Sequence, residues 1–104
     1  SEFREEYDAA VSRAVARLNV LVEYNLPLVK KGGFFAALKG ADVQGEVALS
    51  VRAARKLGAG EPSVIIYELP ESCYGRSIVT YNKIKNTPAF YPRKAGVPSK
   101  DPLL

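Results

Sequence analysis

The side chains best suited to chemistry in this sequence are cations placed where two apolar strands are expected to end. Arg13 lies near the end of the apolar run 7–15, and Lys39 closes the run "FFAALK" at residues 34–39. In open α/β sheets, ligands bind outside the carboxyl ends of the strands, so two cations there could hold an anionic ligand or a phosphate. Each could equally cap a helix or pair with an acid. The pattern predicts a candidate anion site and leaves its role open.

The lack of histidine and the single cysteine, Cys73, exclude several other classes of site. Ser-His-Asp and Cys-His catalysis both require an imidazole, as do many zinc sites. Cys73 cannot form an intramolecular disulfide, and we expect it to be an unreactive loop residue in a reducing, cytoplasmic setting. We expect Glu5, Glu6 and Asp8 to be a solvated strand entry, and the glycines of residues 58–60 to form a plain helix-to-strand turn.

Positive charge is concentrated toward the C-terminus. The net charge of the 104 residues is +4, but from residue 76 onward a single acid, Asp101, faces six bases: Arg76, Lys83, Lys85, Arg93, Lys94 and Lys100. A basic terminus of this kind suits a polyanion such as RNA. On charge alone, a merely solvated tail is an equally good explanation.

Hydrophobic patterning predicts the elements that position these residues, in the order strand, helix, strand, helix, strand, strand. The first helix should start at residue 18, break just before Pro27 and end with Lys30 and Lys31 ahead of two glycines. The second helix should be capped by Asp42 and stopped by Gly58. The four strands are expected at residues 7–15, 34–39, 63–69 and 76–84.

The connections predict the sheet. The first three strands are joined by crossover helices and should be parallel, whereas the six residues 70–75 are too few for a crossover. The expected fold class is therefore α/β, with a mostly parallel sheet that ends in an antiparallel strand. Two helices cannot easily cover both faces of such a sheet, and the first strand resembles an interior strand without its neighbour. Four prolines predict an extended tail at 86–104 after a domain at 1–85.

Two long segments together resemble one protein family. The segment "YDAAVSRAVARLNVLVEYNLPLVKKGGFFAALKG" is similar to the central to late part of the GidB/RsmG ribosomal RNA methyltransferases. The segment "GRSIVTYNKIKNTPAFYPRKAGVPSKDPL" is similar to their carboxy-terminal end, and "YPRKAG" is its most specific motif. The ordered combination of these motifs covers essentially the whole chain.

The resemblance implies part of a Rossmann-like class I methyltransferase fold that binds S-adenosylmethionine and methylates guanine N7 of 16S ribosomal RNA in the small ribosomal subunit. This chain would supply the fourth to seventh strands, with the last strand lying between its two predecessors. Guanine N7 has a free lone pair, so the reaction requires no proton removal and the absence of histidine is no objection.

The resemblance also assigns expected roles to residues. Arg13 matches a family arginine at the cofactor site, and Lys39 and Arg76 match basic residues near the site or the RNA. The terminal motif supplies three residues that could grip phosphates or stack on a base, namely Tyr91, Arg93 and Lys94. The same motif could instead pin the tail onto the sheet.

The family's glycine-rich loop and its ribose-binding acid have no counterpart in this sequence. We therefore expect a carboxy-terminal fragment that binds the cofactor poorly, is inactive alone and self-associates through the strand edge Tyr7–Ser12. Two other readings stay open. One is a stand-alone RNA-binding module whose affinity falls with salt, and the other is a subunit completed by a second chain.

Overall fold

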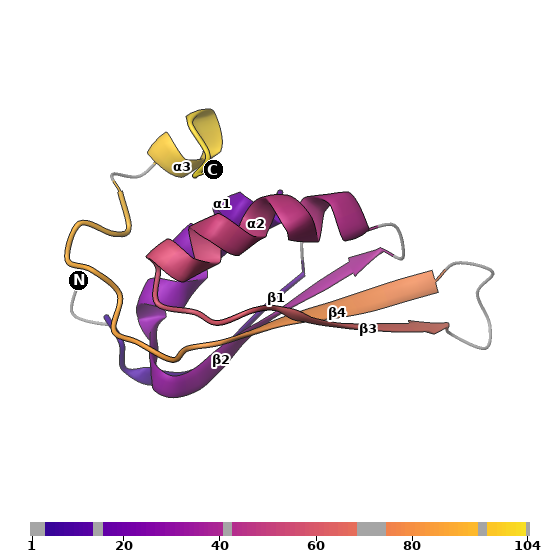
Figure 1. Cartoon of the computed structure of the whole chain (residues 1–104), viewed down its shortest axis with the longest axis horizontal. Helices are drawn as coiled ribbons and strands as arrows, with labels where there is room; N and C mark the ends of the chain where they lie inside the picture. The colour runs from indigo at the N-terminus through magenta and orange to yellow at the C-terminus, as the bar shows by residue number, and fades with distance from the viewer. Residues whose placement is uncertain (1–3, 14–15, 41–42, 69–74, 94–95, 104) are drawn as a thin grey trace.

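The computed structural model describes residues 4–13, 16–40, 43–68, 75–93 and 96–103, so Cys73 lies outside the described part. Figure 1 follows these residues through four strands, two main helices and a short C-terminal helix. In chain order the elements are β1 (Tyr7–Arg13), α1 (Leu18–Asn25), the 3-10 turn η1 (Leu26–Leu28), β2 (Val29–Gly40), α2 (Gln44–Lys56), β3 (Ser63–Glu68), β4 (Gly75–Asn82) and α3 (Val97–Lys100).

The four strands form one mixed sheet in the order β1-β2-β4-β3. β1 runs parallel to β2, whereas β4 is antiparallel to both of its neighbours. The α/β class and the antiparallel last strand between its two predecessors are thus confirmed. The expectation of a mostly parallel sheet is wrong, because β4 separates β2 from β3 although these two strands point the same way. Among the described strands, β1 and β2 alone form a parallel pair.

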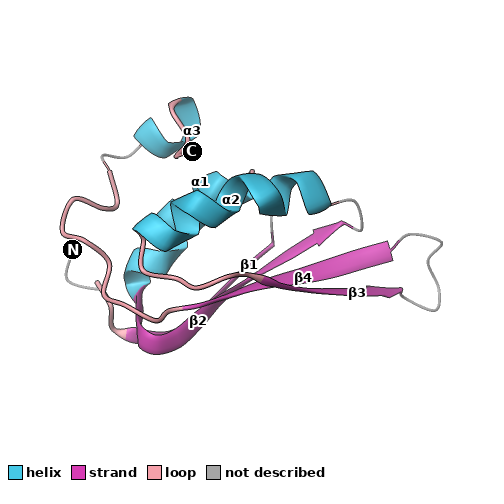
Figure 2. Cartoon of the chain, viewed as in Figure 1, coloured by secondary structure: helices cyan, strands magenta, loops and turns pink. Residues whose placement is uncertain are grey.

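Both main helices cover the same face of the sheet, as Figure 2 shows. Side chains alternate between the two faces of a strand, and those facing the helices form the core: Phe35, Ala37, Val79 and Tyr81 are all fully buried. Within the described part of the chain, no element covers the opposite face, which we call the bare face. There Val11 is 65% exposed and Ile65 is 60% exposed.

The first helix is shorter than its sequence predicts. It ends at Asn25, just before Pro27 as expected, but residues 29–33 continue as strand rather than as helix. Lys30 and Lys31 therefore belong to β2. The physical reason is a close backbone approach at Gly33, where an added Cβ would lie 2.2 Å from the carbonyl oxygen of Asp8. Only glycine allows β2 to pass β1 at this point, where the register between the two strands shifts.

The second helix ends as predicted, and Gly58 is the reason. Its φ of 96° lies in the left-handed region, and an added Cβ would lie 2.3 Å from the carbonyl oxygen of Lys85. The predicted cap Asp42 lies outside the described residues. Residues 58–60 form a plain turn between α2 and β3, as expected. The tail, expected to be irregular throughout, contains the short helix α3, which begins after Gly96.

β1 is also less buried than expected. Its residues are mostly exposed because the strand lies at the edge of the sheet, with β2 on one side.

The centre of the core contains one buried hydroxyl pair. The Tyr81 ring stacks on Phe35 with centroids 6.0 Å apart, and its hydroxyl lies 2.6 Å from Ser50 Oγ. Ser50 donates its single proton to the Val47 carbonyl, so Tyr81 must be the donor to Ser50. Burial raises the pKa of Tyr81 to about 12, with a smaller opposing effect from the Ser50 hydrogen bond.

This pKa predicts a loss of stability at alkaline pH. Between pH 10 and about 12 the unfolded state loses the Tyr81 proton and the folded state keeps it. The free energy of unfolding therefore has its full value below pH 10 and falls by about 3 kcal/mol as the pH rises to about 12. Urea unfolding of the wild type and Tyr81→Phe at a series of pH values measures the effect. At pH 7 the variant should be less stable by about 1 kcal/mol, and the difference should shrink and reverse above pH 10. If the free energies of unfolding of the wild type and Tyr81→Phe changed with pH in the same way, the prediction would be contradicted.

Candidate functional site

The carboxyl ends of β1 and β2 and the amino end of β4 meet at one end of the sheet, where the strands stop. The strand register pairs Arg13 with Leu38, Lys39 with Ser77, and Arg76 with Gly40. The structure therefore brings together the three basic residues that the sequence placed at a candidate site. We call Arg13, Lys39 and Arg76 the strand-end cluster.

The strand-end cluster is divided between the two faces of the sheet. Lys39 follows the buried Ala37 by two positions and points toward the helices, whereas Arg13 lies opposite Leu38 on the bare face. Arg76 lies opposite Gly40, on the same face as Arg13. Neighbouring strands are about 4.8 Å apart, so the backbones of β1 and β4 are separated by roughly 10 Å. Arg13 and Arg76 thus flank the end of β2, where two anionic groups could bind.

Lys39 supports this end of the sheet from the side that the helices cover. Its Nζ donates to the carbonyl of Ala16 at 3.0 Å and to Glu46 Oε1 at 2.6 Å. The same carboxylate oxygen accepts a hydrogen bond of 2.7 Å from the backbone N–H of Leu18. Lys39 and Glu46 therefore fix the chain at Ala16 and Leu18, where α1 begins. The Lys39 side chain is only 13% exposed, which suits a positioning role.

Glu46 is a site residue that the sequence analysis did not single out. It is the acid in the first turn of α2, where the helix dipole favours a negative charge. That preference explains its place in the helix but gives no information about Lys39 or Leu18, because both contacts depend on the fold.

Of the terminal motif, Arg93 lies against α1 and not among the strand ends. Arg93 binds the fully buried carboxylate of Glu23 through its backbone N–H at 2.8 Å, its Nε at 2.9 Å and its Nη2 at 2.8 Å. Arg93 Nη2 also donates to the Asp101 carbonyl at 2.6 Å. The hydrogen bonds that the Arg93 side chain donates to Glu23 raise the pKa of Arg93, desolvation opposes this shift, and the nearby charges of Glu23 and Asp101 add to it. Lys94 lies outside the described residues.

The tail continues along α1 toward the start of that helix, as Figure 1 shows. Asn19, in the first turn of α1, donates from Nδ2 to the Leu103 carbonyl at 3.0 Å. Tyr91 is half buried and packs against the core, and Leu103 joins the core itself. Of the two roles left open for the terminal motif, these contacts favour pinning the tail, although to α1 and not to the sheet.

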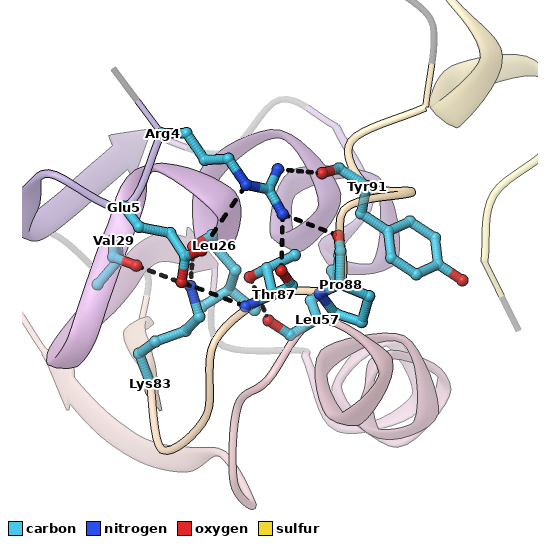
Figure 3. A network of polar contacts seen from close by, with 9 residues as sticks. All are labelled: Arg4, Glu5, Leu26, Val29, Leu57, Lys83, Thr87, Pro88 and Tyr91. Carbon is cyan, nitrogen blue, oxygen red and sulfur yellow. Dashed lines mark hydrogen bonds and ion pairs between the residues drawn. The ribbon is translucent and has the colours of Figure 1, made fainter. Parts of the chain in front are cut away.

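A second polar cluster lies where β4 runs on into the tail, and Figure 3 shows its contacts. Lys83 has a fully buried side chain whose Nζ donates to the carbonyls of Leu26 and Val29 at 2.7 Å each and lies 3.4 Å from Glu5 Oε2. Desolvation lowers the pKa of Lys83, and Glu5 opposes that shift. Glu5, whose side chain is 21% exposed, is therefore not the solvated residue that the sequence suggested.

Arg4 ties the tail to this cluster. Its guanidinium donates to the carbonyls of Thr87 at 2.7 Å and Pro88 at 2.8 Å, and also to the carbonyl of Tyr91. Thr87 is held from two further directions, by Glu5 Oε2 on its backbone N–H at 3.2 Å and by the Leu57 carbonyl on its hydroxyl at 2.5 Å. We call Arg4, Glu5, Lys83 and Thr87 the polar hub.

Two other classes of site find no support in the described part of the chain. No group of three or more His, Cys, Asp or Glu side chains is placed there to hold a metal ion. No helix there is long and apolar enough to cross a membrane.

Comparison with known proteins decides the family. The family model GidB, described as rRNA small subunit methyltransferase G, matches residues 1–71. The chain belongs to the GidB family. Proteins named ribosomal RNA small subunit methyltransferase G are similar to it over 98–99% of its length, with 49% identity in Brevibacillus brevis, 48% in an Exiguobacterium species and 50% in Alkaliphilus oremlandii. The chain spans 43% of the length of each of these relatives.

The GidB match and the relatives cover different parts of the site. The family model includes Arg13 and Lys39 but ends before Arg76 and the tail. The Brevibacillus brevis relative aligns over 102 residues, so its similarity extends into the terminal motif that holds Arg93. Both the strand-end cluster and the pinned tail therefore lie in sequence that this GidB-family chain shares with methyltransferase G proteins.

The contacts of Arg93 predict a stability effect. Arg93→Ala leaves the Glu23 carboxylate buried without its cation, and we expect a loss of about 3–5 kcal/mol in the free energy of unfolding. Lys100→Ala, an exposed cation of the same tail, is the control and should change stability by less than about 0.5 kcal/mol. Urea unfolding at pH 7 measures both. Unchanged stability in Arg93→Ala, with weaker RNA binding, would instead assign Arg93 to gripping RNA.

Proposed function

We propose that this chain is the carboxy-terminal portion of an S-adenosylmethionine-dependent methyltransferase that acts on guanine N7 of 16S ribosomal RNA in the cytoplasm. The observation that carries the proposal is the strand-end cluster, which lies where open α/β sheets bind their ligands, in a chain of the GidB family. The relatives are named as methyltransferases of small-subunit ribosomal RNA, and these names supply the substrate class.

The described residues fit one part of the cofactor. S-adenosylmethionine carries an amino-acid carboxylate, a sulfonium and ribose hydroxyls, and the exposed guanidinium of Arg13 can bind the carboxylate or an RNA phosphate. Glu46, a carboxylate on the helix side of this end of the sheet, is already bonded to Lys39 and Leu18, which leaves it poorly placed to bind the ribose. We propose that the rest of the cofactor site comes from the portion of the relatives that this chain does not span, so the chain alone binds the cofactor weakly and is inactive.

The reaction makes modest demands on the residues of this chain. Bound S-adenosylmethionine would supply a methyl group to the lone pair of guanine N7; the carbon–sulfur bond would break as the carbon–nitrogen bond forms, leaving a neutral thioether and a positive charge on the base. No proton moves. The contribution required of Arg13 and Arg76 is to align the two substrates and to neutralise phosphate or carboxylate charge beside them.

A complementation assay tests this proposal. The chain is mixed with labelled S-adenosylmethionine, under-methylated small-subunit RNA and, in a parallel sample, a separately produced amino-terminal portion of a methyltransferase G relative. We expect methyl transfer only with the added portion, and a loss of roughly 100-fold in Arg13→Ala because a positioning contact is removed. Arg52→Ala, an exposed arginine on α2, is the matched control and should transfer at the wild-type rate.

Two results would separate the alternatives. Methyl transfer with an unlinked amino-terminal portion also fits the alternative in which this chain is a subunit completed by a second chain. That alternative predicts that the two pieces form a stable complex before RNA is added. Salt-sensitive RNA binding by the chain, with no transfer in any sample, would reject the methyltransferase proposal in favour of a binding module.

We further propose that the isolated chain self-associates through β1 and the bare face. Within the described residues β1 has β2 on one side and no strand on the other, and Val11 is 65% exposed at its centre.

Sedimentation velocity across micromolar to millimolar concentrations tests this association. The wild type should form dimers or larger species, and Val11→Lys should stay monomeric because a lysine on an edge strand opposes pairing. Leu49→Lys is the control, since Leu49 is 57% exposed on α2 and lies away from β1. A monomeric wild type at millimolar concentration would reject self-association without affecting the methyltransferase proposal.

A further inference from the structure

The most exposed large apolar side chain among the described residues is Phe90, at 70%. It lies in a turn closed by a hydrogen bond of 3.0 Å from the Tyr91 N–H to the Pro88 carbonyl. Its ring meets the Tyr91 ring edge-on, with centroids 5.1 Å apart and an angle of 85° between the planes. One edge of Phe90 is therefore supported by a neighbouring ring, while most of its surface faces solvent.

The polar hub holds this turn in place. Arg4 donates to the carbonyls of Thr87, Pro88 and Tyr91, which flank Phe90 on both sides in the sequence, as Figure 3 shows. Thr87 is anchored in addition to Leu57 at the end of α2. The backbone of the turn is thus tied to the N-terminal segment and to a helix end, so Phe90 is presented to solvent on a fixed support.

The surroundings of the turn carry exposed positive charge. Lys85 is exposed and five residues from Phe90, at most about 18 Å of extended chain. Its backbone N–H is fixed by the Gly58 carbonyl at 2.9 Å. Lys31 is also exposed, and the neighbouring Gly32 pairs with the Lys83 carbonyl at 2.7 Å, which places β2 beside the segment that contains Lys85.

We propose that Phe90 is a stacking platform for an unpaired base of RNA, with Lys85 and Lys31 binding the adjacent phosphates. A rigid, exposed aromatic ring beside cations matches the way single-stranded nucleic acids are bound, through base stacking and backbone charge. The platform rests on the proposed function for the identity of its ligand. It lies beside the polar hub, away from the strand-end cluster, so it would bind a part of the RNA other than the methylated base.

Fluorescence anisotropy with two labelled strands tests the platform. The probes are a single-stranded RNA of about twelve nucleotides and an abasic ribose-phosphate strand of the same length. Phe90→Ala should weaken binding of the RNA by roughly 5- to 150-fold, the range expected for one lost stacking contact, and should leave binding of the abasic strand unchanged. Phe90→Tyr should keep wild-type affinity, since the ring remains. Leu49→Ala, another exposed apolar residue, is the matched control.

The cations are tested by salt dependence. Lys85→Gln should reduce the slope of log affinity against log salt by about one, whereas Phe90→Ala should leave that slope unchanged. Wild-type RNA affinity in Phe90→Ala, or no RNA binding by the chain at all, would overturn the platform. The first of these results would point to a protein partner for Phe90. The complementation assay judges the methyltransferase proposal separately, because Phe90 takes no part in the transfer itself.

Discussion

The buried ammonium group of Lys83 is the constraint on which one whole end of the structure depends. A buried cation without partners is strongly destabilising, so this side chain can be fully buried only where several acceptors converge on it. The acceptors come from Glu5, from Leu26 in η1 and from Val29 at the start of β2. The N-terminal segment, the end of the first helix and two strands must therefore meet at one place, and the tail is fixed there through Arg4.

Two further ion pairs fix α1 between the sheet and the tail. Lys39 and Glu46 hold the start of α1 against the end of β2 and the start of α2, while Glu23 of α1 binds Arg93 from the tail. A buried ion pair adds little net stability compared with an apolar pair of the same size, but it penalises any arrangement that separates its members. We infer that these contacts serve mainly to select the position of α1.

Local sequence patterns predicted much of this fold, and the failures share a physical cause. The bounds of β3 and β4 lie within two residues of the predicted ones, and Gly58 ends α2 as expected, because alternation and a left-handed stop are local properties. Residues 29–33 form a strand and not the predicted helix end. Lys30, Lys31 and two glycines imitate a helix end, but the extended form of this segment depends on the approach of Gly33 to Asp8. Glu5 and Glu23, the acidic partners of Lys83 and Arg93, are 78 and 70 residues away in sequence, where no local pattern can reveal them.

The position of each strand-end cation along its strand was predictable, but its face was not. Arg13 lies opposite Leu38 and not Lys39, and a shift of one residue would exchange the faces of all the side chains on β1. The observed register places Arg13 and Arg76 on the bare face together with Val11 and Ile65. A partner that buried those apolar side chains would therefore also cover the two guanidinium groups. Burial in a less polar environment strengthens their attraction for an anion, so the cover that stabilises the sheet would also complete the binding site.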